Sequence, residues 1–229
     1  MPSANPLELP EILTLVAEWL SSREIAKCSR VSRLWYRTFN RMVWQKVVIG
    51  TLYPHQPDLQ GIHKNKDSIR SIGVYDKRPY TNDALSSMAW EVIAQLPLLE
   101  SLSVSTCIVK EVVNLFWDVC ERVESLSCND TWFEAAGDLT SRTFPRVQYL
   151  SVWVRLDPHI FDEVDLMRRC PNIESLRWPG HHTTDKFIQL LVDETWHALD
   201  CVDASFTDVP DEIQATIIRS MKKISFWRV

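Results

Sequence analysis

The residues best suited to chemistry are His181 and His182, which follow Pro179 and Gly180 in a turn-like sequence and precede Asp185. Imidazole and carboxylate groups at close spacing could bind a metal ion or transfer protons. No cysteine, glutamate or further aspartate stands at a ligand spacing from the two histidines. A solvated turn is therefore the favoured interpretation, and we expect neither a metal nor a cofactor.

Catalytic motifs are missing from the sequence. It contains no GxSxG nucleophile elbow and no GxxxxGK[ST] phosphate loop, and it has only five glycines with which to shape an oxyanion hole or a phosphate cradle. Sets of serine, histidine and aspartate can be drawn from any sequence of this size. We expect no catalytic residue, and we expect that the protein is not an enzyme.

The six cysteines also lack a chemical pattern. They form no CxxC pair and no metal-finger spacing, so in a reducing compartment they are expected to be small buried hydrophobic residues. They are Cys28, Cys107, Cys120, Cys128, Cys170 and Cys201.

The composition is that of an ordinary globular protein, with 229 residues of which 45% are hydrophobic and 24% charged. No run of eighteen apolar residues is present, and MPSANPLELPE does not resemble a signal peptide, so we expect a soluble protein of the cytoplasm, the nucleus or both, with no membrane partner. Residues 1–50 hold seven lysines and arginines against four acidic residues, which leaves eighteen against twenty-six in the remainder. Because nucleic-acid binding needs concentrated positive charge, this acidic body argues against a nucleic-acid partner.

Three short amphipathic helices are predicted in the first fifty residues. Pro10 suits the first turn of a helix, and apolar residues at helical spacing follow it as far as Leu20. Ser21 and Glu24 form a capping box that starts the second helix. The third helix is predicted from an apolar stripe beyond Ser32, formed by Trp35, Phe39, Met42 and Val43, and it leads into the extended residues 47–49.

These helices carry more apolar side chains than they can bury among themselves. A module below roughly forty residues usually needs a disulfide, a metal or a partner to complete its core. Neither a disulfide pattern nor a metal motif is present here. The surplus is therefore expected to be covered by another protein or by the rest of the chain.

The same residues resemble the F-box, the motif by which substrate receptors attach to the Skp adaptor of SCF-type ubiquitin ligases. The resemblance covers residues 6–49 and rests on Leu9-Pro10, EILTLVAEWL, the break at Ser21-Ser22, IAKCSRVSRLWYR and Trp44. It implies that a set of apolar positions divides between the small core of the module and the adaptor groove. These positions are Leu9, Pro10, Ile12, Leu13, Val16, Leu20, Ile25, Val31 and Trp35. The alternative is a helical cap that seals the following domain.

The remainder of the chain repeats one short phrase, in which apolar residues alternate with small or polar ones. Examples are LLESLSV at 98–104 and NIESLRW at 172–178. The central apolar position recurs at intervals of 22 to 30 residues, which is the period of leucine-rich repeats. It falls at Ile72, Leu102, Leu126, Leu150, Leu176, Val202 and Ile224.

Helical patterns lie between the phrases, so the predicted class is α/β: a three-helix F-box followed by a curved leucine-rich-repeat solenoid of alternating parallel strands and helices. The expected helices are 83–95, 108–122, 159–170, 185–198 and 211–223, and 130–143 is either a helix or a loop. The domains are 6–49 for the F-box, 50–66 for a short connector, and 67–229 for about seven degenerate repeats. We see no capping unit after the final phrase.

The side chains between the buried strand positions should line the open face of the sheet, where solenoids usually bind partners. Many are serines, and larger anchors of the kind enriched in binding hot spots stand among them. The candidates for substrate binding are Tyr75, Tyr149, Trp153, Arg155, Arg177 and Trp227. The alternative is that the serines merely tolerate a crowded surface and the aromatic residues pack on loops.

By resemblance, the chain is expected to be the substrate receptor of an SCF-type ubiquitin ligase, with a Skp-type adaptor and an unknown protein substrate as its partners. Ubiquitin transfer would belong to other subunits, and this chain would supply proximity and orientation. The competing hypothesis is an interaction scaffold whose F-box-like helices bind a partner outside any ligase.

Overall fold

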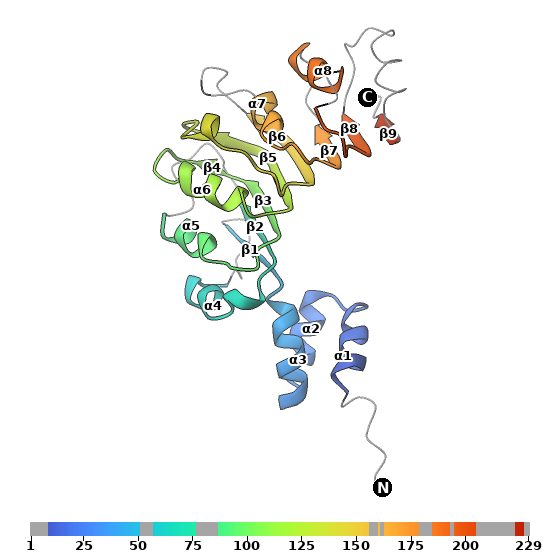
Figure 1. The fold of residues 1–229 in the computed structure, drawn as a ribbon. Coiled ribbons are helices and arrows are strands. Elements are labelled where there is room, and N and C mark those ends of the chain that lie inside the picture. Colours follow the sequence, from blue (N-terminus) through green and yellow to red (C-terminus); the bar gives the residue numbers. More distant parts are fainter. Residues whose placement is uncertain are drawn as a thin grey trace.

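The computed structural model describes residues 9–50, 57–76, 87–155, 160, 163–178, 185–192, 195–204 and 223–226. The chain begins with three helices, α1 (Pro10–Ala17), α2 (Ser22–Cys28) and α3 (Arg33–Val43), which project from one end of a parallel sheet (Figure 1). The predicted capping box is confirmed. The backbone N–H of Ser21 donates to Oε2 of Glu24 at 2.8 Å, and the N–H of Glu24 donates to Oγ of Ser21 at 3.4 Å.

The described strands form one open, parallel sheet in the order β1-β2-β3-β5-β6-β7-β8-β9, and β4 pairs with the C-terminal end of β5. The strands are β1 (Lys46–Ile49), β2 (Ser71–Tyr75), β3 (Ser101–Ser105), β4 (Cys107–Ile108), β5 (Ser125–Phe133), β6 (Tyr149–Arg155), β7 (Ser175–Trp178), β8 (Cys201–Ala204) and β9 (Lys223–Phe226).

The register of the sheet confirms the predicted phrase. Ile72 pairs with Leu102, Leu102 with Leu126, and the series continues strand by strand to Val202 and Ile224. Val47 of β1 extends the same row, so the sheet begins within the residues that end the predicted F-box. From Ile72 to Val202 every central residue is fully buried.

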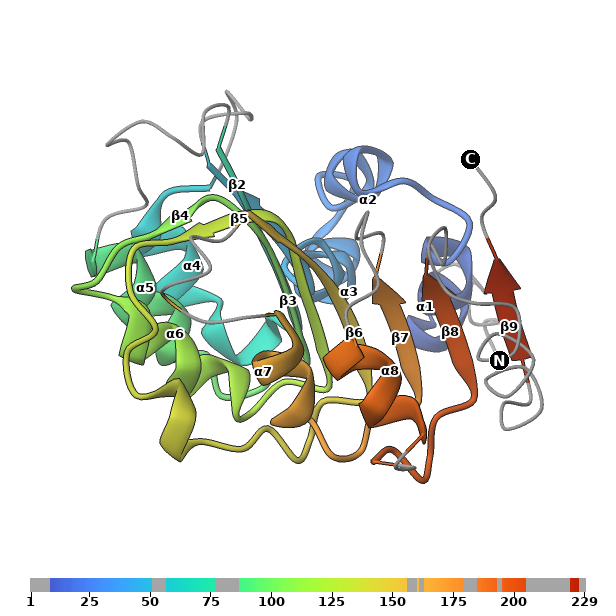
Figure 2. The same cartoon turned by 90° about the horizontal axis from the view of Figure 1, so that it is seen from above.

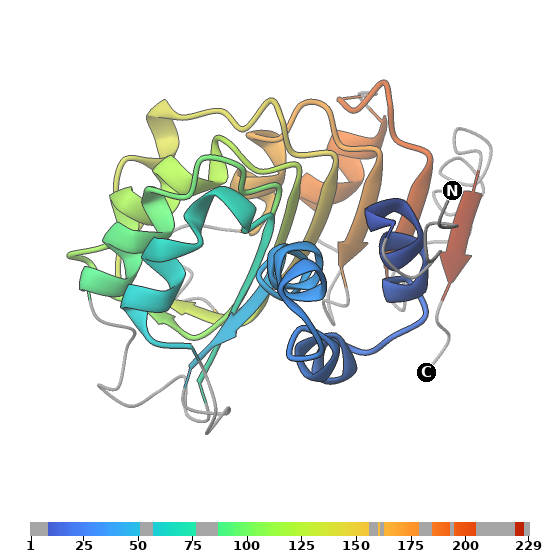
Figure 3. The ribbon, with the colours of Figure 1, turned by 90° about the horizontal axis from the view of Figure 1, so that it is seen from below.

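Helices lie on one face of the sheet, and the sheet curves so that they occupy its outer side (Figures 2 and 3). They are α4 (Leu59–Lys64), α5 (Ser87–Ala94), α6 (Val113–Cys120), α7 (Glu163–Arg168) and α8 (Asp185–Val192). Their apolar side chains, including Trp90, Phe116 and Phe187, share one core with the central strand residues. In most of the described crossovers an amphipathic helix thereby covers the apolar face of the preceding strand, whereas the crossover from β5 to β6 contains only a 3₁₀ turn.

Two predicted helices are shorter in the structure, and the segment 130–143 follows the loop alternative after an extended start. The helix expected at 185–198 ends at Val192, and residues 195–198 are not helical. The helix expected at 108–122 begins only at Val113, because Cys107 and Ile108 form β4 against Trp132 and Phe133. The segment 130–143 is mainly extended and loop-like: β5 runs on to Phe133, and a single 3₁₀ turn covers Leu139–Ser141. The predicted helix at 211–223 lies outside the described residues, except for Lys223 in β9.

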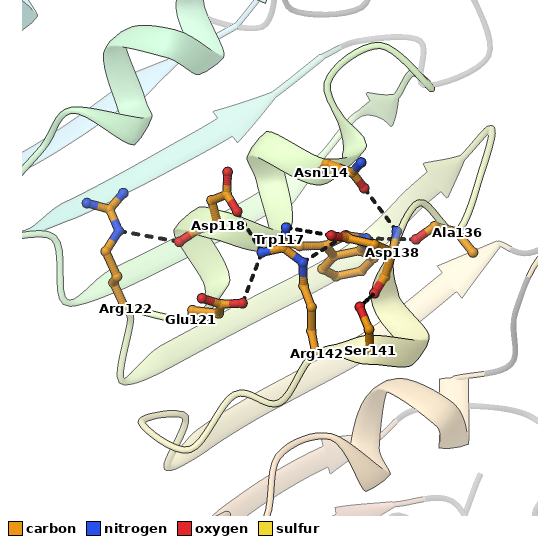
Figure 4. Close-up of polar contacts among 9 residues, drawn as sticks. All are labelled: Asn114, Trp117, Asp118, Glu121, Arg122, Ala136, Asp138, Ser141 and Arg142. Carbon is orange, nitrogen blue, oxygen red and sulfur yellow. Dashed lines mark hydrogen bonds and ion pairs between the residues drawn. The ribbon is translucent and has the colours of Figure 1, made fainter.

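A polar network fastens the segment after β5 to α6 (Figure 4). Arg142, whose side chain is only 14% exposed, forms ion pairs with Asp118 at 2.6 Å, Asp138 at 2.7 Å and Glu121 at 2.9 Å. The indole N–H of Trp117 donates to the carbonyl of Ala136 at 2.8 Å. These contacts hold an irregular stretch in place without a helix of its own.

The helical module has a core of its own, separate from the core of the sheet. Leu13, Ala17, Ile25 and Phe39 are buried together, and the ring of Trp35 meets Phe39 edge to face at 5.4 Å. The junction with the sheet passes through Trp44, which packs on the main core. A Cβ on Gly61 would lie 2.9 Å from the Trp44 ring, so glycine permits this close approach.

All six cysteines lie within the described residues and are free thiols. Cys107, Cys120, Cys128 and Cys170 are buried as predicted, whereas Cys28 and Cys201 are half-buried. Burial raises the pKa of Cys107 to about 11 and that of Cys128 to about 12, which keeps both thiols protonated and unreactive at neutral pH. Within the described ranges no helix has the length and apolar character needed to cross a membrane.

Candidate interaction surfaces

The apolar surface of α1 is wider than the core that it helps to form. Leu13 and Ala17, four residues apart, face the core of the module and are buried. Leu15 and Trp19, also four residues apart, lie on another side, where they are 55% and 88% exposed. The two pairs define two apolar stripes, the second of which starts on α1 at Leu15 and continues at Trp19 in the turn after the helix ends. One stripe is used by the module itself, and the second faces solvent in the single chain.

The structure divides the predicted adaptor-binding positions into three groups. Leu13 and Ile25 belong to the core of the module, while Ile12, Leu20 and Trp35 are half-buried at its margin. The exposed positions are Leu9, Pro10, Val16 and Val31. These four, together with the half-buried three, are the predicted residues that another protein could touch.

Sequence reasoning left Leu15, Trp19 and Tyr36 out of the adaptor-binding set, although all three are large apolar residues exposed on this module. Trp19 falls within the apolar pattern predicted between Pro10 and Leu20, and its position four residues after Leu15 is the signal that separates the two stripes. Tyr36 stands between Trp35 and Arg37 and gives no comparable signal.

The open face of the sheet is built from rows of aligned residues. One row runs through Ser71, Ser101, Ser125, Tyr149, Ser175 and Cys201, and a second runs through Gly73, Ser103, Ser127, Ser151, Arg177 and Asp203. Parallel strands in register bring equivalent positions side by side. The side chains of these rows are therefore small over β2, β3 and β5, and they become larger or charged over β6, β7 and β8.

Tyr75 lies across the first part of this face. Its hydroxyl donates to Oγ of Ser103 at 2.8 Å, and its ring passes so close to Gly73 that a Cβ there would lie 2.4 Å from Cε2 of the tyrosine. Glycine at position 73 thus makes room for the ring. The predicted anchor is half-buried and fixed in place.

A series of side-chain hydrogen bonds joins β5 to β6 on the same face. Asn129 donates from Nδ2 to Oγ of Ser127 at 2.8 Å and accepts from Oγ of Ser151 at 3.0 Å. Directly beyond it the backbone of Asp130 has a φ of 56°, and the register shifts between Asn129 and Thr131. This bulge redirects β5 toward β4 at the edge of the face.

The remaining predicted substrate-binding residues gather over β6 and β7. Tyr149 and Trp153 occupy alternate positions of β6 and are each 36% exposed. Arg177 on β7 is exposed, with Nε 3.3 Å from Oδ2 of Asp203 on β8. Arg155 ends β6 opposite Trp132, and Trp227 lies outside the described residues.

The histidine pair considered for chemistry, His181 and His182, lies outside the described residues. Among the residues that the structure does describe, no group of three or more histidines, cysteines, aspartates or glutamates is arranged to hold a metal ion. The candidate sites considered so far are therefore two surfaces that could bind a partner protein: the exposed apolar flank at α1 and the open face of the sheet.

Comparison with known proteins bears on the first of these surfaces. Residues 10–50, which comprise α1, α2, α3 and β1, match the F-box-like family. A search of curated proteins finds no significant match to the chain. The N-terminal module is therefore an F-box-like domain, the kind of domain that generally serves receptors of SCF-type complexes and typically binds Skp-type adaptors.

Proposed function

We propose that this chain is a substrate receptor of an SCF-type ubiquitin ligase: the F-box-like domain binds a Skp-type adaptor, and the open face of the sheet binds a substrate protein. The chain is not itself an enzyme under this proposal. It fixes the substrate at a set distance from the subunits that transfer ubiquitin.

The observation that carries the proposal is the exposed apolar flank of α1 within the residues that match the F-box-like family. Single exposed apolar residues are ordinary on protein surfaces, but contiguous groups usually mark interaction sites. Here Leu15 and Val16 are exposed on α1 and Trp19 is exposed in the turn that follows it, while the other side of α1 already has a core. An adaptor that covered this flank would bury these exposed apolar side chains.

We also propose that the body is a leucine-rich-repeat solenoid of degenerate type. The single parallel sheet, the helices in most of the described crossovers and the aligned row of central residues all support this. A further support is Thr131, which is fully buried three residues beyond the last apolar position of its repeat. Its hydroxyl donates to the carbonyl of Val104 in the preceding repeat at 2.8 Å, and so joins adjacent units through a side chain.

Within this proposal, the substrate contacts the part of the open face formed by β6, β7 and β8. Aromatic and arginine side chains supply most of the free energy in protein interfaces, and Tyr149, Trp153 and Arg177 gather there. The serines over β3 and β5 leave room for the partner. Trp153→Ala and Arg177→Ala should reduce capture of a bound substrate without changing adaptor binding.

Adaptor binding can be tested directly with purified proteins. The double variant Leu15→Ser/Trp19→Ser removes two exposed side chains and leaves the core residues Leu13 and Phe39 unchanged. We expect it to fold normally and to bind a purified Skp-type adaptor at least about a hundredfold more weakly, because large interface anchors contribute about 2 kcal/mol or more each. Affinity is measured by calorimetry or by biolayer interferometry.

The matched control is Met88→Ser/Leu98→Ser, which removes two exposed apolar residues from the sheet body. This control should bind the adaptor as the unchanged protein does. Failure of the unchanged protein to bind the adaptor, or equal binding by both double variants, would favour the scaffold that acts outside a ligase. Leu9→Ala/Pro10→Ala tests the N-terminal end of the same flank.

A further inference from the structure

The outward sides of α2 and α3 carry a run of positive charge. The cations are Arg23 and Lys27 on α2, Arg30 in the following turn, and Arg33, Arg37 and Arg41 on α3, and all six are exposed. The three arginines of α3 recur at spacing four and lie opposite the buried Phe39. The two helices contain one acidic residue, Glu24, whose carboxylate is used in the capping box. We call these six residues the cationic surface.

Within the described part of the chain none of these six cations forms an ion pair within 4 Å of a carboxylate, although the hydrogen bonds from Ser21 and, to a smaller extent, the charge of Lys27 lower the pKa of Glu24. The arginines of the sheet body differ, because Arg70, Arg142, Arg146, Arg168 and Arg177 all form ion pairs with aspartate or glutamate. Arg122 of the sheet body instead donates to the backbone carbonyls of Ala94 and Leu96. The exposed arginines of the cationic surface remain available to a partner.

The fold does not require this arrangement. Like charges four residues apart on a helix repel each other, and three such pairs occur: Arg23 with Lys27, Arg33 with Arg37, and Arg37 with Arg41. Arg33 is the first residue of α3, where the helix dipole disfavours a cation, and the first turn of α3 has no acidic residue. A helix face that needed only to be solvated would mix the two signs of charge.

We propose that the cationic surface docks an acidic segment of a partner protein. Two large apolar residues stand among the cations, Val31 in the turn and Tyr36 between Arg33 and Arg37, and they are 65% and 54% exposed. Such a surface fits a segment that carries both carboxylates and apolar side chains. The sheet body bears more acidic than basic residues, which repels a long nucleic acid and disfavours that class of partner.

This site goes beyond the adaptor-binding function proposed above. The flank defined by Leu15 and Trp19 belongs to α1 and the turn after it, whereas the six cations lie on α2, on α3 and in the turn between them. The two surfaces are therefore carried by different segments of one module. Loss of one should leave the other intact, so the two proposals can fail separately.

The test uses the full chain and a fluorescein-labelled peptide of about twenty residues, long enough to span α3, in which aspartate and glutamate alternate with occasional leucine. We expect salt-sensitive binding by fluorescence anisotropy. Arg33→Gln/Arg37→Gln/Arg41→Gln should weaken it at least about tenfold, because three charge-assisted contacts are lost. Lys110→Gln/Arg146→Gln/Arg168→Gln, with the same change of net charge on the sheet body, should stay within about twofold.

Two further measurements separate docking from folding. Thermal unfolding should show that the α3 glutamine variant is as stable as the unchanged chain, since repulsion is relieved. Arg33→Lys/Arg37→Lys/Arg41→Lys should retain binding. The proposal is overturned if the peptide does not bind, if both glutamine variants weaken binding equally, if the lysine variant loses binding, or if duplex DNA of equal charge binds more tightly through the same arginines.

Discussion

At the scale of single residues, a few polar side chains hold irregular segments in place where no helix or strand does so. Arg142 is the clearest case, because it is largely buried while its three carboxylate partners remain substantially exposed. Its hydrogen bonds lower the pKa of Asp138, so the ionised pair stabilises the folded state. Desolvation of Asp138 opposes this effect and is the smaller of the two.

Arg142→Gln should therefore reduce the free energy of unfolding by about 1–2 kcal/mol, less than for a fully buried network because water can reach the carboxylates. The control Arg146→Gln, which breaks an exposed pair with Glu124, should change it by less than about 0.5 kcal/mol. Chemical denaturation measures both. Equal effects would contradict an anchoring role for Arg142.

The same pair predicts a pH dependence. Because the folded pKa of Asp138 is depressed, its contribution to stability is present above its unfolded pKa and is lost as the pH falls through the folded value. Asp138→Asn should thus lower stability at neutral pH and flatten the acid side of the stability profile. A profile unchanged in shape would rule out this linkage.

Tyr75 and Gly73 provide a second prediction at this scale. Gly73→Ala should displace the tyrosine ring and break its hydrogen bond to Ser103. Tyr75→Phe should then cost about 1 kcal/mol in the unchanged chain and close to nothing in the Gly73→Ala chain. A double-mutant cycle by denaturation checks this, and equal costs in both backgrounds would mean that the ring does not depend on the glycine.

At the scale of the elements, local sequence signals predict an element correctly where its own residues determine it. The capping box of Ser21 and Glu24 was readable from the sequence because both partners lie within one turn. Strand phrases at regular intervals gave the sheet register, because parallel neighbours repeat the same alternation of buried and exposed positions. The extension of β5 to Phe133 was missed, because it depends on pairing with β4 across a distant turn.

The capping box predicts the behaviour of α2. Ser21→Ala should destabilise the helical module by about 1 kcal/mol. Hydrogen bonds from Ser21 lower the pKa of Glu24, so the contribution of the ionised glutamate to the capping box is present above its unfolded pKa and is lost as the pH falls through the folded pKa. Thr14→Ala, which removes an exposed hydroxyl bonded within α1, serves as the control with a smaller effect on helicity by circular dichroism.

At the scale of the whole molecule, the two interaction surfaces were predictable to different extents. The sequence indicated that α1 carries surplus apolar residues, yet it could not assign Leu13 to the core and leave Trp19 exposed, because both belong to one continuous apolar pattern. Only the packing of α1 on α3 makes that division. On the sheet, the two-residue period was sufficient to place Tyr149, Trp153 and Arg177 on the open face.

The exposed flank of α1 is the feature on which the proposed function rests, and amide hydrogen exchange of the chain with and without a purified Skp-type adaptor tests it most directly. We predict slower exchange in residues 10–20 when the adaptor is present, and unchanged exchange in β5 and β6. A stable complex in which α1 exchanges as fast as in the free chain, while another surface becomes protected, would contradict the account.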